Sequence, residues 1–146
     1  MGGIFKAYDI RGIYGQDLTD ELAYKIGRAF VTFTGCTKVV IARDIRPHSE
    51  PLFANLAKGI MEQGANVIDI GYGSTPMSYF ANGTLGADGS IMITASHNPA
   101  EWNGFKLCRA NAVPHQRGHR HHGDRADRPP GSFCTQGHEP RNALNR

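Results

Sequence analysis

Three short apolar runs, separated by segments with helical periodicity, constrain the fold of this chain more than any other feature. The runs cover residues 39–42, 66–70 and 90–94. Residues 39–42 are continuously apolar, as is typical of a strand buried on both faces, and residues 90–94, with Ile91-Met92-Ile93 at their centre, are expected to be buried as well. Residues 66–70 are expected to form the strand between them. Between the runs, apolar residues recur every three or four positions, as they do on one face of a helix. The alternation predicts an α/β fold, a three-layer sandwich with a mostly parallel or mixed sheet.

Helices are expected before and between these strands. The first lies between Thr19, a suitable N-cap, and Gly35, whose lack of a side chain suits a helix end. The second lies between Ser49 and Gly64, and a third with a weaker apolar pattern covers residues 76–83. The sequence therefore predicts the order strand, helix, strand, helix, strand after an initial helix.

Polar segments follow the predicted strands, where ligands bind in open parallel sheets. These segments are Arg43-Asp44, residues 71–76 and Ser96-His97-Asn98-Pro99. Residues 71–76 lack the third glycine of a dinucleotide-binding fingerprint, which favours a tight turn. Arg43 and Asp44 suit an ion pair at a strand end as well as a binding site.

The segment around Ser96 leaves two interpretations open when it is taken alone. A serine becomes a nucleophile when a base takes its proton, and it can also carry a transferable group. The α/β-hydrolase elbow is not expected, because Thr94 and Asn98 occupy the positions where that motif has glycines. An ordinary polar turn that ends a strand is the alternative.

Three motifs together resemble those of the α-D-phosphohexomutases, the family of phosphomannomutase, phosphoglucomutase and phosphoglucosamine mutase. Residues 94–99, Thr-Ala-Ser-His-Asn-Pro, and residues 101–106, Glu-Trp-Asn-Gly-Phe-Lys, resemble the family's phosphoserine signature. Residues 5–12 are similar to its N-terminal strand and turn, and Arg43-Asp44 with Arg46 to its Arg-Asp loop. The resemblance runs from about residue 5 to residue 114 and identifies the family's N-terminal domain.

The resemblance implies that Ser96 carries a phosphoryl group. Ser96 would give it to a hexose monophosphate and take a phosphoryl group back from the resulting hexose bisphosphate, which moves phosphate between the 1 and 6 positions of the sugar. Lys106 and Arg11 are the implied catalytic cations, because phosphoryl transfer depends mainly on positioning and electrostatics. The residues implied to bind phosphate or substrate are His97, Asn98, Tyr8 and Arg43.

The resemblance also implies Mg²⁺ as a cofactor, bound in the family by an Asp-x-Asp-x-Asp loop of a second domain. The nearest match here, Asp124 and Asp127, has the wrong spacing. We therefore expect the metal to meet this chain only through the phosphate of Ser96, since the aspartate ligands are absent. We expect the chain alone to be inactive as a mutase, with the missing C-terminal domains as partners in trans.

Residues 115–146 differ in composition from residues 1–114, which we take as the α/β domain. Ten Lys and Arg balance ten Asp and Glu before residue 115, whereas the remainder has six Arg, three acidic residues and five of the seven His. With so few large apolar side chains, this tail is expected to be disordered. Its His and Arg content suits a gene read out of frame. A frameshift would leave a truncated enzyme whose domain is incomplete at its C-terminal end, with apolar sheet surface uncovered.

Several classes of protein are not expected. No run approaches the roughly 18 apolar residues of a membrane helix, and the first residues do not resemble a secretory signal. The three cysteines are widely spaced, which favours a reducing compartment. We therefore expect a cytoplasmic protein that binds hexose phosphates and bisphosphates, with neither a nucleic acid nor a membrane as partner. A non-catalytic phosphate- or sugar-phosphate-binding module is the alternative.

Overall fold

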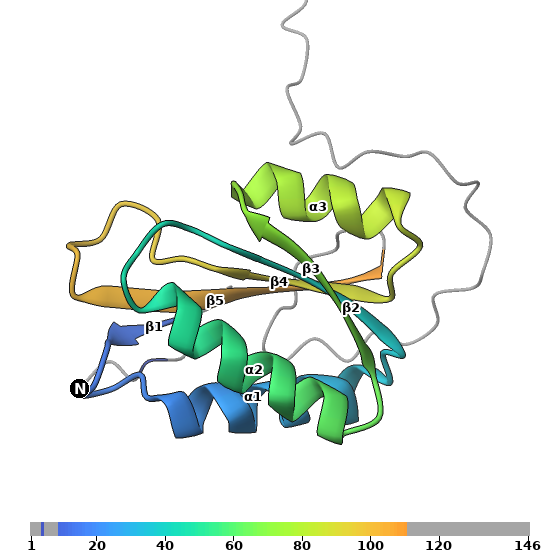
Figure 1. Ribbon diagram of the computed structural model, residues 1–146, viewed down its shortest axis with the longest axis horizontal. Coiled ribbons are helices and arrows are strands. Elements are labelled where there is room, and N and C mark those ends of the chain that lie inside the picture. Colours follow the sequence, from blue (N-terminus) through green and yellow to red (C-terminus); the bar gives the residue numbers. More distant parts are fainter. Residues whose placement is uncertain (1–3, 5–8, 111–146) are drawn as a thin grey trace, which may run out of the picture.

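A mixed five-stranded sheet forms the centre of the fold (Figure 1). The computed structural model describes residues 4 and 9–110. The strands lie in the order β1-β5-β4-β2-β3. Their bounds are Asp9–Ile13 for β1, Lys38–Arg43 for β2, Asn66–Tyr72 for β3, Gly89–Ile93 for β4 and Trp102–Arg109 for β5. β2 is parallel to β3 and β4, whereas β5 is antiparallel to β4 and β1.

Helices cover both faces of this sheet. The helices are α1 (Asp20–Thr34), α2 (Ser49–Glu62) and α3 (Thr75–Thr84). Figure 1 shows α1 and α2 side by side below the sheet and α3 above it. The arrangement confirms the predicted α/β fold with three layers, in its mixed rather than its mostly parallel form.

The predicted helices and the three apolar strands are all present, and their ends follow local rules. The hydroxyl of Thr19 accepts a hydrogen bond from the N–H of Leu22 (3.2 Å), which caps α1. Gly35 ends α1 with a φ of 71°, a left-handed conformation that glycine adopts without strain.

β5 was not predicted from the apolar pattern. It extends the sheet on the side of β4 away from β2 and joins β1 to it.

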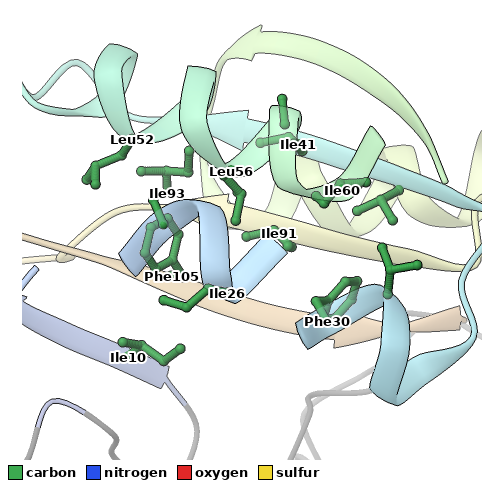
Figure 2. Close-up of a cluster of buried hydrophobic side chains, with 14 of the residues drawn as sticks. Ile10, Ile26, Phe30, Ile41, Leu52, Leu56, Ile60, Ile91, Ile93 and Phe105 are labelled. Carbon is green, nitrogen blue, oxygen red and sulfur yellow. The ribbon is translucent and has the colours of Figure 1, made fainter. Parts of the chain in front are cut away.

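The main core lies between the sheet and the pair α1 and α2. Figure 2 shows side chains from both helices meeting those of four strands. Because side chains alternate along a strand, Ile91 and Ile93 point into this core while Met92 between them does not. The labelled members are Ile10, Ile26, Phe30, Ile41, Leu52, Leu56, Ile60, Ile91, Ile93 and Phe105.

The opposite face of the sheet has a smaller core under α3. It contains Val40, Ala81 and Ala87, with Ile68 and Ile70 packed against it. Met77 and Phe80 of α3 expose 52% and 58% of their surface. These exposed side chains belong to a helix, so the expected uncovered sheet surface stays a prediction. The expected disordered tail, residues 115–146, lies outside the described residues. No helix among the described residues is both long and apolar enough to cross a membrane.

Candidate active site

The loop between β4 and β5 carries Ser96. β4 ends at Ile93 and β5 begins at Trp102, so the loop lies at the carboxyl end of a central strand. The N–H of Thr94 donates to the carbonyl oxygen of Gly104 (2.9 Å), and the N–H of Asn98 donates to that of Ala95 (3.1 Å). These bonds tie the loop both to β5 and to itself, so its backbone has a defined shape.

Ser96 combines an exposed side chain with a strained backbone. Its φ is 59°, and it is the one non-glycine residue with a positive φ in the described part of the chain. The N–H of Ser96 donates to the hydroxyl of Thr94 (2.9 Å). The Ser96 hydroxyl lies 3.3 Å from Nδ1 of His97. A left-handed non-glycine residue costs about 1–3 kcal/mol and is often found at functional sites.

Arg11 and Lys106, the two predicted catalytic cations, share one carboxylate oxygen. Oδ2 of Asp9 lies 2.9 Å from Nε and 2.6 Å from Nη2 of Arg11, and 3.3 Å from Nζ of Lys106. The strand register explains the cluster, because Asp9 of β1 lies opposite Lys106 of β5, and Arg11 lies two residues further along β1. Only 10% of the Asp9 side chain is exposed. The cluster carries one excess positive charge.

Arg11 connects this cluster to the serine loop. Its Nη1 donates to the side-chain oxygen of Asn98 (3.3 Å), two residues after Ser96. The structure therefore brings together Arg11 and Lys106 on neighbouring strands and links them to the loop of Ser96, His97 and Asn98.

A second arginine, Arg46, holds the same loop from its other side. Its Nε donates to the carboxylate of Asp44 (3.2 Å). Its two terminal nitrogens donate to four carbonyl oxygens, those of Pro99 (2.6 Å), Trp102 (2.9 Å), Ser96 (3.1 Å) and Asn98 (2.7 Å). An open hollow of about 460 Å³ lies beside it, lined by Asp44, Ile45, Arg46, Ser96, Asn98 and Ala100.

The match with protein-family models decides the family of the chain. Residues 2–122 match a model described as phosphoglucomutase/phosphomannomutase, alpha/beta/alpha domain I. The chain belongs to the phosphoglucomutase/phosphomannomutase family. The resemblance inferred from the serine loop, the N-terminal segment and the Arg-Asp loop is thereby confirmed.

Curated relatives are phosphomannomutases and a related mutase. A phosphomannomutase of Klebsiella pneumoniae is 51% identical over 110 residues, which cover 75% of this chain and 70% of that protein. One of Escherichia coli is also 51% identical over 110 residues, but these cover 24% of its length. A probable phosphoglucosamine mutase of Thermococcus kodakarensis is 42% identical over 113 residues, 77% of this chain and 25% of that protein.

Solved structures of the family have the same fold. A phosphoglucomutase/phosphomannomutase family protein of Burkholderia thailandensis is 41% identical with a TM-score of 0.67. A putative phosphomannomutase of Thermus thermophilus is 27% identical with a TM-score of 0.71. Each match covers 77% of this chain and 27% of the solved chain. The chain thus spans about a quarter of these two family members.

Two further residues were predicted for the site, Tyr8 and Arg43. Tyr8 lies outside the described residues, so its role stays a prediction. Arg43 is buried and its guanidinium is held by Glu50 (2.7 Å) and Asp69 (2.6 Å). Burial by itself would lower the pKa of Arg43, but the hydrogen bonds to these two carboxylates outweigh it and raise the pKa. These contacts give Arg43 a structural role at the ends of β2 and β3, and we leave it out of the proposed phosphate site.

The residues present do not form a magnesium site by themselves. Among residues 9–110, no three His, Cys, Asp or Glu side chains gather where they could hold a metal ion. Two carboxylates that contact the cations beside the serine loop, those of Asp9 and Asp44, already bind cationic side chains. We therefore derive no step through a metal, and the contact of Mg²⁺ with a phosphate on Ser96 stays a prediction.

Asp9 is the site residue that sequence reasoning missed. It was quoted within the N-terminal motif but given no role. The signal that could have identified it is the pairing of this motif with the segment that contains Lys106. In an antiparallel pair, an acidic residue opposite a lysine forms a stabilising pair. That register becomes visible only with β5 in place.

Proposed function

We propose that this chain supplies the phosphoserine domain of a phosphohexomutase. Ser96 accepts a phosphoryl group from a hexose bisphosphate and returns it to a hexose monophosphate. The observation that carries the proposal is the exposed hydroxyl of Ser96 on the loop that Arg11 contacts through Asn98. Relatives named phosphomannomutase support it further.

The transfer exchanges one phosphorus–oxygen bond for another. Oγ of Ser96 attacks the phosphorus, a new bond to Oγ forms, and the bond between phosphorus and the sugar oxygen breaks. The sugar oxygen takes up a proton and the serine hydroxyl loses one, and we assign this proton exchange to Lys106. Arg11 and Lys106 offset the charge of the transferring group, which is the main contribution a protein makes to phosphoryl transfer.

The rest of the reaction depends on parts of the enzyme outside this chain. The matched residues cover 24% of the Escherichia coli phosphomannomutase. We assign sugar recognition and the carboxylates for Mg²⁺ to the remaining domains of the family. The chain alone is then inactive as a mutase, and mutase activity appears when the missing domains are supplied in trans.

Phosphorylation of Ser96 tests the proposal directly. The purified chain is incubated with glucose 1,6-bisphosphate, Mg²⁺ and the separately produced remaining domains of a family member, and mass spectrometry follows the gain of a phosphoryl group on the peptide that contains Ser96. The gain is expected in the wild type and in Ser74→Ala, a control at another exposed serine, and it is absent in Ser96→Ala. Binding of the sugar bisphosphate without transfer would contradict the proposal and favour a non-catalytic binding module.

A further inference from the structure

The guanidinium of Arg46 has no donor left for a ligand. A guanidinium has five N–H groups. In Arg46 one of them bonds the Asp44 carboxylate, and the other four bond backbone carbonyl oxygens of the serine loop and the start of β5. A phosphate beside Ser96 would therefore have to compete with five existing hydrogen bonds of Arg46. The geometry points to Arg46 as part of the loop's support.

A short polar relay fixes Arg46 in turn. Oδ2 of Asp44 accepts from Nε of Arg46, and Oδ1 accepts from the hydroxyl of Ser49 (2.7 Å). That hydroxyl accepts from the side-chain amide of Asn103 (3.1 Å). Ser49 and Asn103 are fully buried, so these bonds form away from water, where unpaired polar groups are costly. The relay connects the start of α2 with β5.

Arg46, fixed by this relay, holds the backbone of Ser96. Nη2 of Arg46 donates to the carbonyl oxygens of Ser96 and Asn98, the residues immediately before and after His97. Holding these oxygens fixes the backbone of Ser96 in its left-handed conformation, with φ of 59°, and hence the direction of its Cα–Cβ bond. A lysine could not replace this function, because its donors diverge from a single nitrogen and cannot reach four separate carbonyls.

We propose that Arg46 is a positioning residue that holds the Ser96 loop, and with it the Ser96 hydroxyl, in the geometry for phosphoryl transfer. The effect of Arg46 on the reaction rests on the proposed function of Ser96, whereas its effect on the conformation of the loop is independent of that function. The two parts can therefore be measured separately on the same chain.

Hydrogen exchange tests the hold on the loop. In Arg46→Lys, the amides of Asn98 and Trp102 are expected to exchange at least about tenfold faster, because several hydrogen bonds to a charged group are lost. The amide of Ile91 in β4 serves as the internal reference and keeps its protection. Ile60→Val is the matched control, since it weakens the core far from the loop and changes no loop amide selectively. Wild-type protection of Asn98 and Trp102 in Arg46→Lys would overturn the proposal.

A second variant keeps the test valid if Arg46→Lys does not fold. Asp44→Asn retains the shape of the side chain but weakens its bonds to Arg46 and Ser49. It is expected to speed exchange of the same loop amides by a smaller factor. Unchanged exchange in this variant would count against the relay.

Phosphorylation of Ser96 by glucose 1,6-bisphosphate, with Mg²⁺ and the remaining domains supplied in trans, tests the effect on the reaction. Arg46→Lys is expected to lower the initial rate at least about tenfold while Ile60→Val leaves it unchanged, since a small displacement of a reacting atom has a large effect on rate. A loosened loop with an undiminished rate would overturn the positioning role. Absence of phosphorylation in the wild type would instead refute the proposed function of the chain, and hydrogen exchange alone would then decide whether Arg46 holds the loop.

Discussion

Ser96 occupies a backbone conformation that favours glycine, yet the proposed reaction requires a side chain there. Nδ1 of His97 lies 3.3 Å from the Ser96 hydroxyl. The hydrogen bond from the Ser96 N–H to the Thr94 hydroxyl and the contact of its carbonyl with Arg46 hold the conformation in place. Strain of this kind persists where the surroundings over-determine the backbone, and functional residues are common among such positions.

Replacement of Ser96 by glycine is therefore expected to stabilise the fold while removing the phosphoryl acceptor. Glycine relieves the left-handed strain, and we expect Ser96→Gly to be more stable than Ser96→Ala by about 1 kcal/mol. Both variants lack the hydroxyl, so the comparison isolates the backbone. Urea unfolding of the two proteins measures the difference. Equal stability would show that the loop imposes no strain on residue 96.

Asp9 holds two cations in a position where little of its side chain is exposed, and its removal should affect both stability and the site. Asp9→Asn leaves Arg11 and Lys106 without their shared carboxylate, and the expected loss is about 1–3 kcal/mol. The rate of Ser96 phosphorylation falls as well, because both cations lose their alignment. Thermal unfolding and the phosphorylation assay measure the two effects.

The matched control for Asp9 is an exposed ion pair. Glu21 bonds Lys25 one turn along α1 (2.6 Å), with both side chains well exposed. Exposed pairs contribute little to stability. Glu21→Gln should leave the melting temperature and the phosphorylation rate unchanged. If Asp9→Asn behaved in the same way, the shared carboxylate would have no organising role.

At the scale of residues, the sequence motifs supplied the candidate site residues. They did not indicate which distant side chains bind and orient these residues. Ser96, Asn98, Arg11 and Lys106 follow from motifs, because each motif is a short stretch of chain. The partner of Lys106 is 97 positions away in the sequence, so only the register of β1 on β5 identifies Asp9. For Arg43 the sequence left an ion pair at a strand end open beside a binding role, and the structure identifies Glu50 and Asp69 as its partners.

At the scale of elements, α1 and α2 cross so closely that two glycines are required. A Cβ on Gly59 would lie under 3.0 Å from the backbone oxygen of Tyr24, and one on Gly27 under 3.0 Å from that of Leu56. Gly59→Ala should therefore cost about 1–2 kcal/mol net, because the clash exceeds the gain in helix propensity.

The control lies on α3, where a Cβ on Gly83 meets no atom within 4 Å. Gly83→Ala is expected to gain about 0.5–1 kcal/mol, since alanine favours helix. Thermal unfolding of both variants checks the pair of predictions. A stabilised Gly59→Ala would mean that the two helices separate at little cost.

Asp88 ties the start of β4 to that of β2, and its effect on stability should depend on pH. The hydroxyl and N–H of Thr37 (2.6 and 2.8 Å) and the N–H of Lys38 (3.1 Å) donate to its carboxylate. The hydrogen bonds from Thr37 contribute most to holding the pKa of Asp88 below its usual value of 3.8. Its stabilisation is thus present above the unfolded pKa and lost as pH falls through the lower folded pKa.

Asp88→Asn should accordingly destabilise the protein by about 1 kcal/mol at neutral pH, an amount reduced by partial exposure. The difference from wild type should shrink as the pH falls below about 4, because the wild-type carboxylate then becomes protonated. Urea unfolding at a series of pH values measures it. A difference that stays constant down to the lowest pH would contradict the role of the charge.

The strands that could be predicted from the sequence are those composed mainly of apolar residues. Strands β2 and β4 are buried on both faces, so their composition alone identifies them. β5 alternates instead, with Phe105 and Leu107 packing in or against the main core while Lys106 lies on the other face. Gly104 and the charged residues conceal this alternation in the sequence. Its antiparallel direction depends on pairing partners that no local pattern specifies.

At the scale of the whole molecule, the described elements cover the two faces of the sheet unequally. The core between the sheet and the pair α1 and α2 contains nearly all of the large buried side chains. The layer under α3 contains mainly small ones, and Met77, Phe80 and Leu85 on or beside α3 are exposed. Within the described residues, most of the buried apolar surface therefore lies in one layer, and the other layer has exposed apolar side chains.

The sequence positions of the core residues give a prediction for the domain boundary proposed at residue 114. Among residues 4 and 9–110, the members of the two core clusters and the side chains packed against them lie between Ile4 and Leu107. A chain that ends at residue 114 keeps every one of these described residues, so we expect it to melt within about 2 °C of the 146-residue chain. Paired calorimetry of the two chains measures the difference, with Ile60→Val in both as the control that a core change is detected equally. A clearly lower melting temperature for the shorter chain would show that residues 115–146 contribute to the fold, and the proposed boundary would then be wrong.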